Sequence, residues 1–246
     1  MRVSAKDLVD VGGVDVGDSP RVVASVGERD VGKLVDVGEN LDLGRVDLLE
    51  LRVDLLDDPF DPELRRGLSN FVPGVPVILT VRRESEGGDF RGSENKRVDL
   101  LCKLIDFVDA VDIEYRTQGD LRDRVLQRAQ EEGLPVIVSL HKMDRAGKKD
   151  ELRNDLESLL ETGDIAKLAV KANSLKDCLN LLDVTQEVKK ELKKPICSIA
   201  MGDIGRFTRV VAPLFGSDLI YAPARNETAP GQIPLEKINY ILKNLL

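Results

Sequence analysis

The sequence predicts a single-domain α/β protein of the (β/α)8 barrel (TIM barrel) class, and three observations lead to this prediction. The chain has 246 residues, and a barrel of eight strand–helix units takes about 250. From Arg21 onward, short runs rich in β-branched residues alternate with segments of helical period. These runs number eight, which favours closure into a barrel over an open doubly wound sheet. Residues 1–20 are expected to form a short N-terminal arm or hairpin, and residues 21–246 the barrel.

Each predicted strand is a short apolar run bounded by Pro, Gly or Asp. The eight strands are expected at Val22–Val26, Val46–Val53, Val77–Arg82, Ala110–Tyr115, Val136–His141, Ala166–Lys171, Ile196–Met201 and Asp218–Ala222. Repeated strand–helix units predict a parallel sheet with right-handed crossovers. No glycine-rich GxGxxG turn follows the first strand, which disfavours a dinucleotide-binding fold.

Local signals mark several of the intervening helices. Asp61-Pro62-Glu63 supplies an aspartate cap with proline at the first helical position. Ser174-Leu175-Lys176-Asp177 has the outline of a capping box. Ile238, Ile241 and Leu245 form the apolar stripe of the last helix.

Composition narrows the class of protein. The net charge of −8 disfavours nucleic acid and anionic membranes as partners, because both require a basic face. Three cysteines without metal-ligand spacing are typical of a reducing compartment, and no signal core or membrane-spanning segment is visible, so we expect a soluble cytoplasmic protein. A single histidine, His141, excludes a histidine-rich metal site, and no metal or organic cofactor is implied.

Five predicted strands carry two polar residues on one face, close to their carboxyl ends. The pairs are Glu50 and Arg52, Thr80 and Arg82, Asp112 and Glu114, Ser139 and His141, and Lys167 and Lys171. Residues of one parity share a face of a strand, and barrel active sites are built at the carboxyl ends of the strands. One pair is explained by a buried ion pair, but five together favour an active site.

The order of these motifs resembles the type I 3-dehydroquinate dehydratase family from Arg21 to the C-terminus. The matching segments are Glu50-Leu51-Arg52, Thr80-Val81-Arg82 followed by Glu86-Gly87-Gly88, Val111-Asp112-Ile113-Glu114, Val136–His141, Ala166–Val170, Met201-Gly202 with Arg209, and Thr228-Ala229-Pro230-Gly231-Gln232. Each motif alone is weak, whereas their order and spacing are specific. Leu140 and Lys142 depart from the residues usual beside the histidine, and Thr228 stands where the family usually has Ser. An ammonium of Lys142 facing His141 would lower the pKa of the imidazole.

The resemblance implies a hydro-lyase of the shikimate pathway of aromatic amino-acid biosynthesis, which converts 3-dehydroquinate to 3-dehydroshikimate. Lys167 would form a Schiff base with the ketone, His141 would act as acid and base, and Glu86, rather than its neighbour Glu84, would orient the ring. Burial and nearby arginines favour the neutral amine that must attack; the alternative is a structural ion pair of Lys167 with Glu50 or Glu114. Lys171, on the same strand face, is the rival nucleophile.

The remaining matched residues are implied as substrate ligands. Arg209 would bind the carboxylate, and the other implied ligands are Glu50, Arg52, Arg82, Thr228, Gln232 and Met201. The loop Asn226–Gln232 is polar and precedes the last helix, so it is a candidate lid. A homodimer is also implied.

Two other functions remain open from the residues alone. A class I aldolase or transaldolase-like enzyme would share the barrel, the lysine and the imine, but usually has a glycine-rich phosphate site after the seventh and eighth strands. A barrel that binds a small anion without turnover is the third possibility, favoured only by Lys142 beside His141. The fold alone does not decide among the three, because barrels host many functions.

Overall fold

The computed structural model describes residues 5–41, 44, 46–229 and 231–245. Three parts of the predictions therefore lie outside the described residues: positions 1–4 of the N-terminal arm, Pro230 of the loop motif and the side chain of Leu245. No helix of the described part is long and apolar enough to cross a membrane.

Eight parallel strands form the barrel, in the spatial order β10-β3-β4-β5-β6-β7-β8-β9. Their bounds are β3 Arg21–Val26, β4 Leu48–Arg52, β5 Val77–Thr80, β6 Ala110–Glu114, β7 Val136–Lys142, β8 Ile165–Lys171, β9 Ile196–Met201 and β10 Leu219–Pro223. The two ends of the sheet meet where the Asp218 backbone N–H donates to the carbonyl of Ile196 at 2.6 Å. The predicted barrel fold is confirmed.

Three strands end earlier than the sequence predicts. β4 stops at Arg52 because Val53–Leu55 turns into a 3-10 helix, β5 stops at Thr80 rather than Arg82, and β6 stops at Glu114 rather than Tyr115. All three differences lie at the carboxyl ends of strands, where the backbone leaves the ladder to build the loops of the barrel mouth.

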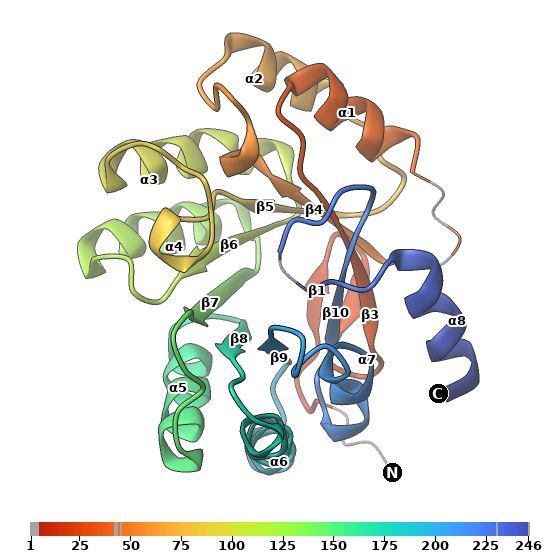
Figure 1. Cartoon of the computed structure of the whole chain (residues 1–246). Helices are drawn as coiled ribbons and strands as arrows, with labels where there is room; N and C mark the ends of the chain where they lie inside the picture. Colours follow the sequence, from red (N-terminus) through yellow and green to blue (C-terminus); the bar gives the residue numbers. More distant parts are fainter. Residues whose placement is uncertain (1–4, 42–43, 45, 230, 246) are drawn as a thin grey trace.

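The helices surround the strands (Figure 1). They are α1 Val31–Glu39, α2 Pro62–Ser69, α3 Glu94–Leu104, α4 Gly119–Glu132, α5 Lys149–Thr162, α6 Leu175–Leu192, α7 Thr208–Val211 and α8 Leu235–Leu245, with 3-10 helices at Val53–Leu55, Glu84–Glu86, Ile105–Phe107 and Ala212–Phe215. Asp61 caps α2 by accepting from the Glu63 N–H, with Pro62 next to it, and Ser174 and Asp177 form the predicted capping box of α6. Both cap predictions are confirmed.

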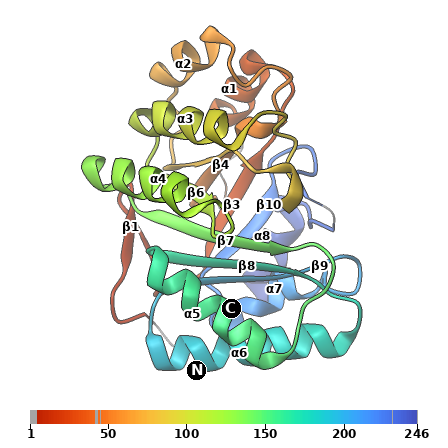
Figure 2. The same cartoon turned by 90° about the vertical axis from the view of Figure 1, so that its left-hand side faces the viewer.

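A short antiparallel hairpin, β1 Val9–Val11 and β2 Val14–Val16, lies at the end of the barrel where the strands begin (Figure 2). Val11 and Val16 are fully buried and pack with the inward residues at the strand starts, such as Leu48 and Ile78. This apolar contact closes the lower end of the barrel. The cavity lined by polar side chains lies at the opposite end, where the strands finish.

Candidate active site

Lys167 lies at the centre of the barrel, at the third position of β8, and is 4% exposed. Its Nζ is 3.0 Å from Oδ2 of Asp112 on β6 and 3.5 Å from Oε1 of Glu50 on β4. The sequence predicted arginines around this amine, but its ion-pair contacts are carboxylates. The further contacts of Asp112 and Glu50 explain how these two carboxyl groups remain ionised inside the barrel.

Glu50 accepts hydrogen bonds from the Ser25 hydroxyl at 2.5 Å and the Thr80 hydroxyl at 2.9 Å. Burial opposes its ionisation, but the charges of Lys167 and Arg52 outweigh burial and lower the pKa of Glu50. Glu50 is therefore an anion whose two oxygens are fixed from three strands.

Arg82 follows β5 and is almost fully buried between three partners. Its guanidinium is 2.8 Å from Asp112, 2.9 Å from Glu114 and 2.7 Å from the Ser139 hydroxyl. Although burial acts against it, Arg82 together with Lys167 holds the pKa of Asp112 far below its ordinary value. Four members of the predicted polar pairs thus form one connected network: Arg82, Asp112, Glu114 and Ser139.

His141 sits near the end of β7, in contact with Glu86 from the 3-10 helix after β5. Oε2 of Glu86 accepts the backbone N–H of His141 at 2.8 Å and lies 3.1 Å from its ring Nδ1. Gly87, at φ 84°, ends the 3-10 helix in the left-handed conformation that glycine adopts without strain. The predicted partner Glu86 is the residue in contact, whereas Glu84 is exposed.

Burial sets the titration of this pair. It raises the pKa of Glu86 to about 7, with Glu114 adding to the effect, and Oε1 of Glu86 is buried without a hydrogen-bond partner in the described structure. Burial, Arg82 and Lys167 keep the pKa of His141 well below its usual value. The imidazole is therefore neutral at neutral pH, as a base requires.

Lys142 points away from His141. Its ammonium pairs with Asp155 at 2.9 Å and with Glu151 at 3.8 Å, both on α5, so it faces the helix layer. Leu140 is likewise buried in the outer core. Neither departure from the family pattern reaches the imidazole, because neighbours in a strand point to opposite faces.

The loop before α8 closes over the barrel mouth. Oε1 of Gln232 accepts the backbone N–H groups of Thr228 at 2.8 Å and Ala229 at 3.2 Å. The Thr228 hydroxyl donates to Ser25 at 2.9 Å, and Nη1 of Arg52 donates to the Thr228 carbonyl at 3.1 Å. Arg52 is in turn paired with Asp54 at 2.7 Å. This loop is therefore tied directly to β3 and β4.

These side chains enclose a cavity of about 50 Å³. Its lining contains nine of the ten predicted site residues, Glu86 alone excepted: Glu50, Arg52, Arg82, His141, Lys167, Met201, Arg209, Thr228 and Gln232, together with Ala169, Ile199, Tyr221 and Ala229. Lys171 is exposed at the end of β8 and does not line the cavity, which disfavours the rival nucleophile.

Two residues of this site were not predicted. Ser25 is a lone hydroxyl in the apolar strand β3, and Tyr221 is the one aromatic residue of β10; its ring centroid lies 4.0 Å from Nζ of Lys167. The sequence did contain one signal for them: both stand at alternate positions of their strands that point into the barrel. Only packing shows which polar residue on that face reaches the lysine.

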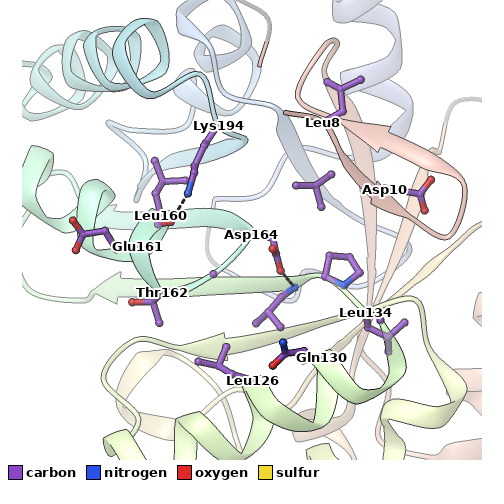
Figure 3. Close-up of a pocket in the computed structure, with 15 residues that line it drawn as sticks. Leu8, Asp10, Leu126, Gln130, Leu134, Leu160, Glu161, Thr162, Asp164 and Lys194 are labelled. Atoms are coloured by element: carbon purple, nitrogen blue, oxygen red, sulfur yellow. Dashed lines mark hydrogen bonds between the residues drawn. The ribbon is translucent and has the colours of Figure 1, made fainter. Parts of the chain in front are cut away.

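A larger hollow of about 630 Å³ lies at the opposite end of the barrel, between the hairpin and the α4–β7 and α5–β8 connections (Figure 3). Two of its charged residues bind the main chain: Asp164 accepts from the Val136 N–H, and Lys194 donates to the Leu160 carbonyl. The hollow holds no arrangement comparable to that around Lys167. Among the described residues, no group of three or more His, Cys, Asp and Glu side chains is arranged to hold a metal ion.

The sequence matches the profile of the family described as type I 3-dehydroquinase over residues 22–245. The chain belongs to the type I 3-dehydroquinase family. This is a family of hydro-lyases, and the resemblance inferred from the motifs is confirmed. The match disfavours the aldolase-like reading.

Members of the type I 3-dehydroquinase family are similar to this chain over nearly its whole length. The 3-dehydroquinate dehydratase of Methanosarcina barkeri is 39% identical and that of Methanococcoides burtonii 37%, covering 97% and 94% of this chain and 100% and 97% of the relatives. The crystal structure of the Geobacillus kaustophilus dehydratase superposes with a TM-score of 0.90 at 31% identity, covering 100% of this chain and 98% of that one. A type I dehydratase from Clostridium difficile, solved with covalently modified comenic acid, gives 0.90 at 27% identity, with 98% of each chain covered.

Proposed function

We propose that this protein dehydrates 3-dehydroquinate to 3-dehydroshikimate through an imine on Lys167. The observation that carries the proposal is the position of the Lys167 amine: it is buried in the mouth of a barrel of this family, in a cavity that His141 also lines. The covalently modified ligand in the Clostridium difficile relative is consistent with a reactive nucleophile in the shared fold.

The chemistry begins at the substrate ketone. The Lys167 ammonium first loses a proton to water; the neutral amine then attacks the carbonyl carbon, and the carbinolamine loses water to give a protonated imine. Asp112 and Glu50, at 3.0 and 3.5 Å from the amine, stabilise this cation and accept hydrogen bonds from it. The imine is a stronger electron sink than the ketone, which makes the adjacent carbon acidic.

His141 carries the proton in the next two steps. Its neutral ring removes the proton α to the imine, and the electron pair moves to nitrogen to form an enamine. The enamine then expels the β-hydroxyl group, which takes the proton back from His141 and leaves as water. Nδ1 of the ring faces Glu86, so Nε2 is the atom available to the substrate. Hydrolysis of the product imine regenerates Lys167.

The remaining side chains suit an anion with several hydroxyl groups. Arg209 is buried in the cavity wall and is the guanidinium suited to the carboxylate, while Gln232, Thr228 and Met201 line the same cavity. Glu50, Arg52 and Arg82 are held by their own partners and shape the floor of the site. The homodimer and the cytoplasmic location implied by the resemblance stay predictions; the molecular mass in solution tests the first.

The test is reduction of the imine. We expect incubation with 3-dehydroquinate and borohydride to place a stable secondary amine on Lys167, located by peptide mass spectrometry, and Lys167→Met to form no adduct and no product. Lys171→Met is the matched control on the same strand and should react normally. An adduct on Lys171, or full activity in Lys167→Met, would contradict the assignment.

A further inference from the structure

Tyr221 stands beside the Lys167 amine but has no part in the reaction proposed above. It lies in the middle of β10, is 5% exposed and lines the same cavity as Lys167. Its ring centroid is 4.0 Å from the Lys167 Nζ, well inside the range of about 6 Å over which an aromatic face attracts a cation.

The ring covers a side of the amine that the carboxylates leave open. In the circular strand order, β6 and β10 are each two strands from β8, on opposite sides of it, and β4 is the strand across the barrel. Three strands therefore contribute contacts to the Lys167 nitrogen: Asp112 from β6, Glu50 from β4 and Tyr221 from β10. The nitrogen is therefore confined by two anions and one electron-rich surface.

The ring, rather than the hydroxyl, makes this contact. Oη of Tyr221 is buried and has no hydrogen-bond partner among the described residues. Burial, together with Glu50 and Cys197, raises the pKa of this hydroxyl well above its usual value, so the group remains neutral. A neutral phenol keeps the negative face of its ring available to a cation.

We propose that Tyr221 is a positioning residue for the Schiff-base nitrogen: its ring face holds Nζ of Lys167 in place as the ammonium and again as the protonated imine. The inference rests on the imine chemistry proposed above. The ring favours the two cationic forms over the neutral amine and the enamine. It thus stabilises the imine, the electron sink on which proton removal depends, at one fixed position relative to His141.

The test lowers the electron density on the face of the ring while nearly keeping the shape of the ring. Phenylalanine, 4-fluorophenylalanine and 3,4,5-trifluorophenylalanine are placed at position 221 of the full chain, since fluorine withdraws charge from the ring face. We expect kcat to fall stepwise along the series, by about tenfold at the trifluoro ring. In the ligand-free protein, Lys167 should meanwhile become more reactive toward acetic anhydride, because the ammonium is held less firmly. A structural role alone would not move these two quantities in opposite directions.

Two further substitutions at position 221 serve as references for the fluorine series. Tyr221→Phe keeps the ring and should remain close to the wild type, whereas Tyr221→Leu should lose at least as much kcat as the trifluoro form. Leu219→Val, on the same face of β10 but below the cavity, controls for loosened packing. Constant kcat and constant acetylation along the fluorine series would overturn the proposal, as would equal losses in Tyr221→Phe and Tyr221→Leu. Borohydride trapping of the wild type tests for the imine independently. If no adduct forms, the proposed function is contradicted, while acetylation of Lys167 along the fluorine series still tests the contact between its amine and the ring of Tyr221.

Discussion

At the scale of single residues, the contact between Glu86 and His141 decides how the site responds to pH. Glu86 is buried and titrates near pH 7, while His141 is kept neutral by burial and by the charges of Arg82 and Lys167. When His141 takes the substrate proton it becomes a cation, and an ionised Glu86 at 3.1 Å stabilises that cation. The active form is therefore the one with ionised Glu86, and activity should rise as the pH increases through about 7.

Glu86→Gln tests this dependence because the amide keeps the shape of the carboxyl and cannot ionise. At pH 6 most Glu86 is protonated, so the variant should resemble the wild type. At pH 8 its kcat/KM should be roughly tenfold lower, and the limb near neutral pH should disappear. Glu84→Gln, on the exposed neighbour, is the control. An unchanged limb in Glu86→Gln would assign it to another group.

At the scale of elements, we expect the loop before α8 to move when a substrate enters. The cavity of about 50 Å³ holds no more than a few waters, whereas a cyclic acid with several hydroxyls is several times larger. The loop is held closed by the Gln232 side chain and by its contacts with Ser25 and Arg52. Closure around a bound ligand would restore those contacts and exclude water from the imine.

Gln232→Ala removes the side-chain oxygen that accepts hydrogen bonds from two backbone N–H groups of the loop. We expect KM to rise about tenfold, and the ligand-free loop to be cut faster in limited proteolysis, because two backbone N–H groups lose their partner. Asn226→Ala, in the same loop as Gln232, loses only an exposed hydrogen bond to Glu28 between β3 and α1, and should change both quantities far less. A higher KM with unchanged proteolysis would mean that Gln232 serves the ligand and not the loop.

At the scale of the whole molecule, a buried ion pair fastens the lower end of the barrel. Nζ of Lys189 on α6 is 2.7 Å from Asp218, just before β10, and also donates to the carbonyls of Gly17 and Lys194. Asp218 accepts the Ile196 N–H at the point where β9 and β10 meet. One pair thus joins the hairpin, a helix and the seam of the sheet, far from the chemistry.

Asp218→Asn should lower the free energy of unfolding by about 3 kcal/mol, measured by chemical denaturation, because Lys189 is left as a buried charge without its carboxylate. Asp183→Asn breaks the exposed pair with Lys149 and should cost less than about 1 kcal/mol. The kcat of folded Asp218→Asn should equal that of the wild type. A loss of kcat without a loss of stability would show that the two ends of the barrel are coupled.

The sequence by itself determined the number of strands, their parallel arrangement, the caps at Asp61 and Ser174, and the parity of the polar residues at the barrel mouth. These follow from local rules, since hydrophobic period and capping depend on residues close together in the chain. The nine predicted side chains that line one cavity were named from the resemblance to the family. Strand parity accounts for those on the strands but not for Arg209, Thr228 and Gln232, which lie on a helix and in a loop.

The resemblance implied the contact of Glu86 with His141, but only the tertiary structure decided which groups contact Lys167. Glu50 and Asp112, 117 and 55 residues from Lys167 along the chain, supply its ion pairs, and Tyr221 and Ser25 join the site from strands read as core. Strand parity likewise leaves open where the long side chain of Lys142 ends, and packing against α5 directs it to Asp155. Such contacts depend on the stagger of strands around a closed barrel, which sets the depth of each side chain and is not written in any local segment.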